Sequence, residues 1–172
     1  KKKISLQSGE TDLQPGYYRG GIQATSTASI VMAPGIYYMD GGGFQFTSSG
    51  SLTATGVMIY NAPNNASDAV TINGSGPINL SGPTSGLYQG ITVFVDRTQD
   101  VPVNVQGNGS QTVISGTFYD AGGLISLAGN GGVTNMQSQF ICRAMDISGN
   151  GDITIAWAPQ LVAQKRFIGL VE

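Results

Sequence analysis

A strand and turn unit recurs along this chain at intervals of roughly 20 to 30 residues, and this repeat restricts the fold more than any other feature. Each unit opens with a Gly and a short strand that contains an aromatic residue. A Gly-rich turn, a second strand, a small polar turn and a third strand follow. The openings of five units are Gly16-Tyr17-Tyr18, Gly35-Ile36-Tyr37, Gly56-Val57-Met58-Ile59-Tyr60, Gly90-Ile91-Thr92-Val93-Phe94 and Gly116-Thr117-Phe118-Tyr119.

Such a unit has one apolar face, because its strands alternate apolar and polar residues with period two, and it cannot bury that face alone. Stacking like strands in parallel buries the face and pairs each backbone with the units on either side. The repeat therefore predicts an all-β fold, a single-domain right-handed parallel β-helix (β-solenoid) of about six or seven coils. An antiparallel sandwich or jelly roll is the alternative, since its strand number and turn spacing would be similar.

The length of 172 residues is that of one domain, and residues 1–172 are predicted to form a single β-helix. Residues 1–12 are expected to form an N-terminal strand or cap, 13–157 the repeated coils, and 158–172 a C-terminal strand or cap that covers the coil end. The segments 62–67 and 81–89 interrupt the repeat, and we expect them to bulge out as loops.

Two sets of residues recur at equivalent places in successive units and predict stacked ladders. Asn tolerates the left-handed conformation of tight corners, and stacked amides hydrogen-bond along the axis. We therefore expect a polar ladder at one corner, formed by Asn108, Asn130 and Asn150. An aromatic ladder with one ring per coil is expected from Tyr18, Tyr37, Tyr60, Phe94 and Tyr119.

The composition lacks the residues on which most catalysis and metal binding depend. There is no His, and the single Cys, Cys142, is expected to be an ordinary buried thiol. Only 10% of residues are charged and the net charge is −2, which argues against a nucleic-acid partner. No run approaches the ~20 apolar residues that span a bilayer, so no membrane span is expected in this segment. Few charges with abundant Gly, Ser, Thr and Asn favour an extracellular or cell-surface location.

Enzymes built on a β-helix use clustered carboxylates with nearby basic residues. Here the Asp residues are scattered, and only Asp96, Asp120 and Asp146 could lie on neighbouring coils, with Arg97 and Arg143 near them. We expect them to sit at strand ends, solvated or paired. The sequence thus predicts no catalytic residues, no metal site and no cofactor, and the protein is not expected to be an enzyme.

Several Gly-rich segments together resemble a known family. They resemble the Gly-rich C-terminal β-helical region of bacterial Tad-type (Flp) pilus-assembly proteins of the TadG-like kind, where a "PGxYxGGI … PGIYxxxGGG … GTGVxxY" succession precedes a "PTSGxYxGI" loop. The resemblance covers most of the chain, and it implies a surface or envelope protein with a short upstream membrane anchor, associated with pilus assembly or adhesion. The segments that carry it are 13–22, 34–44, 55–61, 81–91 and Asp96-Arg97.

Two kinds of binding residue are candidates. Tyr17, Tyr38 and Tyr88 are expected to include exposed rings that could stack on the sugars of a polysaccharide. Flat Thr rows would instead indicate an ice-binding β-helix, but the Thr-x-Thr pairs do not recur from unit to unit, which makes this the remote alternative. The Thr residues concerned are Thr25, Thr27, Thr47, Thr53 and Thr55.

The sequence as a whole favours a non-enzymatic structural or adhesive domain at the cell surface, in a pilus-like or fibrous assembly. Its expected partners are other proteins, or further copies of the chain that stack through the coil ends. A carbohydrate-binding or carbohydrate-processing β-helix is the alternative.

Overall fold

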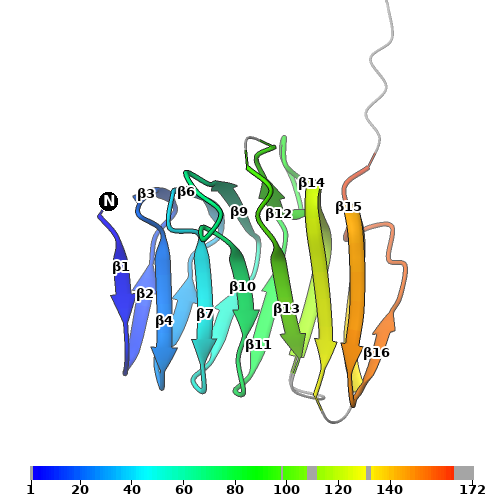
Figure 1. The fold of residues 1–172 in the computed structure, drawn as a ribbon, viewed down its shortest axis with the longest axis horizontal. Coiled ribbons are helices and arrows are strands. Elements are labelled where there is room, and N and C mark those ends of the chain that lie inside the picture. The colour runs from blue at the N-terminus through cyan, green and yellow to red at the C-terminus, as the bar shows by residue number, and fades with distance from the viewer. Residues whose placement is uncertain (1, 98, 108–111, 131–132, 165–172) are drawn as a thin grey trace, which may run out of the picture.

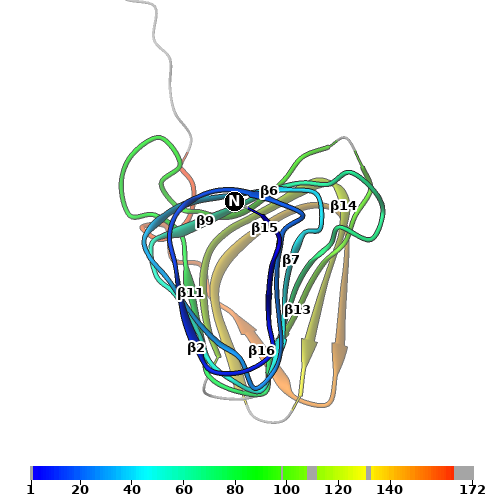
Figure 2. The same ribbon diagram turned by 90° about the vertical axis from the view of Figure 1, so that its left-hand side faces the viewer.

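The computed structural model describes residues 2–97, 99–107, 112–130 and 133–164. They form an all-β solenoid of about six turns in which every strand pairs with its neighbours in parallel (Figure 1). Viewed from the N-terminal end, the chain winds clockwise as it recedes, so the solenoid is right-handed (Figure 2). The parallel pairing confirms the β-helix and excludes the antiparallel sandwich.

The strands build three faces, here called A, B and C. Face A holds β1 (Ile4–Leu6), β4 (Ile22–Ser26), β7 (Phe44–Ser48), β10 (Val70–Asn73) and β13 (Val103–Gly107). Face B holds β2 (Glu10–Leu13), β5 (Ser29–Met32), β8 (Leu52–Ala54), β11 (Ile78–Ser81) and β16 (Asp152–Ile155). Face C holds β3 (Gly16–Arg19), β6 (Gly35–Asp40), β9 (Val57–Ala62) and β12 (Ile91–Val95). The long strands β14 (Thr112–Gly129) and β15 (Val133–Gly149) run through all three faces.

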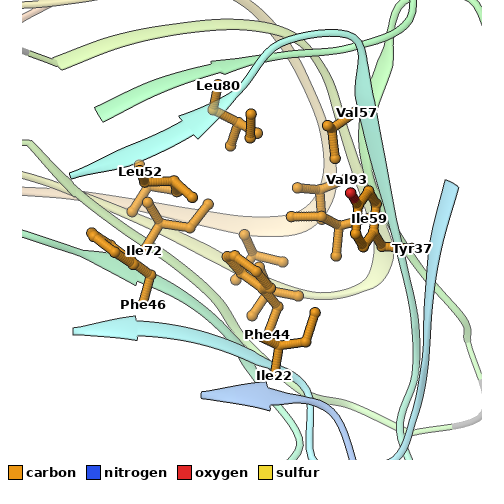
Figure 3. Packing of buried hydrophobic residues seen from close by; sticks show 14 of the residues in the cluster. Ile22, Tyr37, Phe44, Phe46, Leu52, Val57, Ile59, Ile72, Leu80 and Val93 are labelled. Atoms are coloured by element: carbon orange, nitrogen blue, oxygen red, sulfur yellow. The ribbon is translucent and has the colours of Figure 1, made fainter. Parts of the chain in front are cut away.

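The core consists of columns of inward side chains, because alternate residues of each strand point into the solenoid and the register aligns them from coil to coil. On face A one such column contains Ile22, Phe44, Val70, Val103 and Ile125, each at most 1% exposed. Figure 3 shows how these columns meet side chains from faces B and C in the interior. Full burial stabilises an aliphatic or aromatic side chain by about 1.5–3 kcal/mol, so the columns supply the main driving force for stacking.

The corner between faces C and A is built from glycines on successive coils. Gly41, Gly42 and Gly43 all have φ near +70°, which only Gly adopts without strain. A Cβ at Gly42 would lie far inside van der Waals contact of the Gly20 carbonyl oxygen on the preceding coil. The Gly runs noted in the sequence therefore let two backbones meet at this corner.

Loops widen the coils without changing the stack. As predicted, the chain leaves the coil between β9 and β10 and between β11 and β12. The register on either side continues unbroken, since Val70 pairs with Phe44 below and Val103 above.

The N-terminal end of the solenoid begins with strands. β1 and β2 pair with β4 and β5, so residues 4–13 are part of the first coil. Residues 159–161 form a turn after β16, and the Ala163 N–H donates to Thr117 Oγ1 at 2.8 Å. The remainder of the predicted C-terminal strand, 165–172, lies outside the described residues. No helix long and apolar enough to cross a membrane occurs in the described part of the chain.

Candidate functional surfaces

An unbroken column of aromatic rings runs along the outside of face C. Successive rings lie 4.7–5.2 Å apart between centroids and within 16° of parallel. The column differs from the predicted ladder in two members, since it contains Tyr17 and Tyr38 in place of Tyr18 and Tyr37. Its rings are those of Tyr17, Tyr38, Tyr60, Phe94 and Tyr119.

The correction follows from the register between the first two coils. Gly16 pairs with Tyr37 and not with Gly35, so the two Pro-Gly-x-Tyr segments are offset by two residues. Tyr18 and Tyr37 point inward, are at most 1% exposed and stack on each other at 5.8 Å. Each hydroxyl donates to the carbonyl oxygen four residues earlier in the chain: Tyr18 to Gln14, and Tyr37 to Ala33. Burial raises the pKa of Tyr37.

The inward hydroxyl gives a first prediction. Tyr37 lies within hydrogen-bond distance of the carbonyl oxygens of Leu13 and Ala33, at 2.8 and 2.9 Å, and Tyr37→Phe removes this donor from a buried site. We expect a loss of about 1–2 kcal/mol in the free energy of unfolding, measured by urea titration. Tyr38→Phe, on the outer column, should change it by less than about 0.5 kcal/mol. Equal losses in the two variants would contradict the inward assignment.

The stacked geometry limits what the outer column can bind. Each interior ring has both faces covered by its neighbours, so the column presents ring edges to solvent. Sugars stack on ring faces, which makes Tyr38 a poor platform for them. Polar groups contact the edges of the rings. The Tyr60 hydroxyl donates to Asp96 Oδ2 at 2.9 Å, and burial together with this hydrogen bond raises the pKa of Tyr60 to about 12. The Arg97 guanidinium lies 5.4 Å from the centroid of the Tyr119 ring.

Tyr88 lies apart from the column, on the loop between β11 and β12. Its side chain is 40% exposed and lines a hollow of about 400 Å³ together with Ile36 and Leu87. The remaining lining residues are uncharged: Pro34, Gly35, Gly56, Pro83, Thr84 and Ser85. Of the three tyrosines singled out in the sequence, Tyr17 and Tyr38 are thus brought together in one stack, and Tyr88 belongs to a separate pocket.

The predicted Asn corner is described only in part. Asn108 lies outside the described residues. Asn130 and Asn150 are exposed and sit at the turns that follow β14 and β15. The Asn130 N–H donates to the Gly107 carbonyl at 3.0 Å, which ties this turn to the coil below it.

The three carboxylates that could have formed a catalytic cluster point in different directions. Asp96 accepts the Tyr60 hydroxyl beside face C, Asp120 points into the interior at 2% exposure, and Asp146 is exposed on face A. Arg143 pairs with Asp100 at 2.7 Å on the surface. Within the described ranges, no three Cys, Asp or Glu side chains come close enough together to hold a metal ion.

Asp120 is nevertheless an unusual residue, because it is a carboxylate inside the solenoid. Its Oδ2 has no hydrogen-bond partner among the described residues, and a Cβ at Gly123 would collide with the carboxylate. Burial, reinforced by the charge of Asp100, raises the pKa of Asp120 to about 6. On the next coil, half-buried Cys142 has its thiol pKa raised by burial and by Asp120.

The Thr residues considered for ice binding do not form an extended row. Thr25 and Thr47 are neighbours on the outside of face A, but the next residues in that column are Asn73, Gln106 and Ala128. Thr53 lies on β8 of face B.

A further hollow, which no feature of the sequence predicts, lies on the outside of face A. It measures about 310 Å³ and is lined by uncharged side chains of β10, β13 and β14. No motif marks it, because its residues are ordinary polar residues of outward strand positions.

Comparison of the chain with protein-family models, with curated proteins and with solved structures gives no match.

Proposed function

We propose that this chain is a non-enzymatic structural or adhesive module of a cell-surface assembly, of the pilus-like or fibrous kind. The observation that carries the proposal is the unbroken parallel stack, in which each coil is hydrogen-bonded along the axis from β1 to β16. A load across such a stack is shared by all the hydrogen bonds of a coil interface, as in other solenoids whose stability is a sum of nearest-neighbour terms. The divergent orientations of Asp96, Asp120 and Asp146 also support a non-enzymatic role.

The setting at a bacterial cell surface is supported by the low charge and by the resemblance to TadG-like pilus-assembly proteins. The outward positions of face A carry mostly Ser, Thr, Asn and Gln, so this surface depends little on salt or pH for its solvation. A protein on the cell envelope is exposed to changes in both salt concentration and pH.

The charges at the coil ends favour a different protein as partner over a second copy stacked in register. Glu10 on β2 and Asp152 on β16 are exposed, and the strand pairing places them at the two ends of one outward column of face B. Head-to-tail stacking in register would set these carboxylates opposite each other, and like charges directly opposite destabilise a strand pair.

Immunogold electron microscopy on the source cells, with antibody raised against this domain, tests the assembly directly. We expect gold along thin filaments. Gold spread evenly over the envelope, or found only in the medium, would contradict the fibrous setting. Release of reducing ends from a polysaccharide panel by the purified chain would contradict the non-enzymatic role.

A further inference from the structure

The outside of face A carries two parallel columns of uncharged side chains, nearly all of them polar. Neighbouring members of one column lie ~4.8 Å apart along the axis, and the columns are separated by two residues along each strand, or ~6.7 Å. The strand pairing defines the first column as Gln23, Gln45, Thr71, Asn104 and Ser126. The second column contains Thr25, Thr47, Asn73, Gln106 and Ala128.

A step in side-chain size creates the groove within these columns. Asn104 and Gln106 of β13 are long, whereas Ser126 and Ala128, their partners on β14, are short. The resulting hollow of about 310 Å³ is completed by Thr71 and Asn73 of β10, with Val105 also in its lining. Because all of these residues lie on regular paired strands, the groove is held in shape by the sheet and not by loops.

The chemistry of the lining indicates the kind of ligand. Asn73, Asn104 and Gln106 place side-chain amides in the lining, and each amide offers two N–H donors and an oxygen acceptor. Ligand hydroxyl groups can both donate to and accept from such amides. The lining has no charged side chain, so nothing in it would compensate the buried charge of an ionic ligand.

We propose that this groove binds a neutral polysaccharide. A protein partner fits less well, because interfaces between proteins bury an apolar and aromatic centre, whereas this lining is polar apart from Val105 and Ala128. An acidic glycan is disfavoured by Asp146, which continues the first column beyond Ser126 and is exposed. This glycan site is independent of the structural role proposed above. The domain would still be a rigid rod without the site, and the site would still bind glycan if the domain belonged to no fibre.

Affinity electrophoresis of the purified chain in native gels tests the groove. The gels contain hydroxyethylcellulose or galactomannan as neutral probes, or polygalacturonate as the acidic one. We expect retardation by a neutral probe, and a roughly tenfold or larger weakening in the double variant Asn104→Ala/Gln106→Ala, which deletes two amides. The matched control is Asn79→Ala, which removes an exposed amide from β11 on face B, and it should bind as the unchanged chain does.

Two further variants make each outcome decisive. Ala128→Trp fills the groove from the opposite side and should also abolish retardation, which covers the case in which the double variant does not fold. Tyr88→Ala should bind normally, and loss of binding in this variant would move the glycan to the loop pocket and overturn the proposal. Retardation by polygalacturonate alone, no retardation in any gel, or undiminished retardation of the folded groove variants would each overturn it as well.

Discussion

Replacing Gly42 with Ala should destabilise the solenoid by about 3 kcal/mol or more, a large part of the 5–15 kcal/mol that stabilises a typical domain. Two costs add at this position. The backbone has φ +70°, which is strained for any residue with a Cβ, and the new methyl group would collide with the carbonyl of Gly20 on the preceding coil. The coils cannot separate locally to relieve the collision without breaking the hydrogen bonds between them. The free energy of unfolding from urea titration, followed by far-ultraviolet circular dichroism, gives the measurement.

Gly9→Ala is the matched control for this substitution. Gly9 has φ +74°, close to that of Gly42, but a Cβ there would meet no atom within 4 Å. This variant should therefore show only the backbone cost, about 1–2 kcal/mol. If the two variants were destabilised equally, close backbone contact at the Gly corner would not be what holds these coils together.

The second large effect concerns Asp120 and pH. Its pKa of about 6 in the folded chain lies above the ordinary value of 3.8, so the folded state binds the proton more tightly than the unfolded state does. The free energy of unfolding should then fall as pH rises from about 4 to about 6, and stay low above that range. Linkage over this interval corresponds to about 2 kcal/mol. Protonation also gives the Asp120 carboxyl a hydrogen to donate. Its two oxygens and the Val101 carbonyl oxygen all lie close to the position that a Cβ at Gly123 would occupy.

Asp120→Asn isolates this contribution from that of the other carboxylates. The amide is neutral at every pH, so the variant should be more stable than the unchanged chain by about 2 kcal/mol at pH 7.5 and similar to it at pH 4. Asp152→Asn, on the exposed surface of β16, changes the net charge equally and serves as the control. A stability difference for Asp120→Asn that did not vary with pH would show that Asp120 is not a buried carboxylate.

The sequence was sufficient to predict the solenoid, because its signals are local. The repeated unit is indicated by strands that alternate apolar and polar residues, such as Val70-Thr71-Ile72-Asn73, and by the recurring Gly turns. A unit with one apolar face has few ways to bury that face. The loops that interrupt the repeat could be predicted for the same reason.

The aromatic column could be predicted only in part. Tyr17 and Tyr18 are adjacent, as are Tyr37 and Tyr38, so each pair contains one inward and one outward ring. Which ring faces outward depends on the register between coils, and a slip of one residue exchanges the two sides. The two-residue offset that pairs Gly16 with Tyr37 keeps each ring on its side and sets Tyr17 opposite Tyr38 in place of Ile36, and no local feature of the sequence indicates it.

The groove on face A was beyond prediction for a different reason. Thr71, Asn104 and Ser126 come from three coils, and the hollow arises from the difference in length between neighbouring side chains. Aromatic and charged residues are the usual indicators of a binding site, and the lining of this groove contains neither. Neutral amides at outward strand positions carry no such mark.

The loops that leave the coils have a consequence for how this molecule can change over evolutionary time. Ile22 and Phe44, which pair on face A, are 22 residues apart, whereas Val70 and Val103, which pair in the same way, are 33 apart. The additional residues are absorbed at the corners, so the rise from one coil to the next is the same in both places. Insertions and deletions at these corners can therefore alter the girth of the rod without altering its length, and new surface can be acquired there while the shared core columns stay as they are.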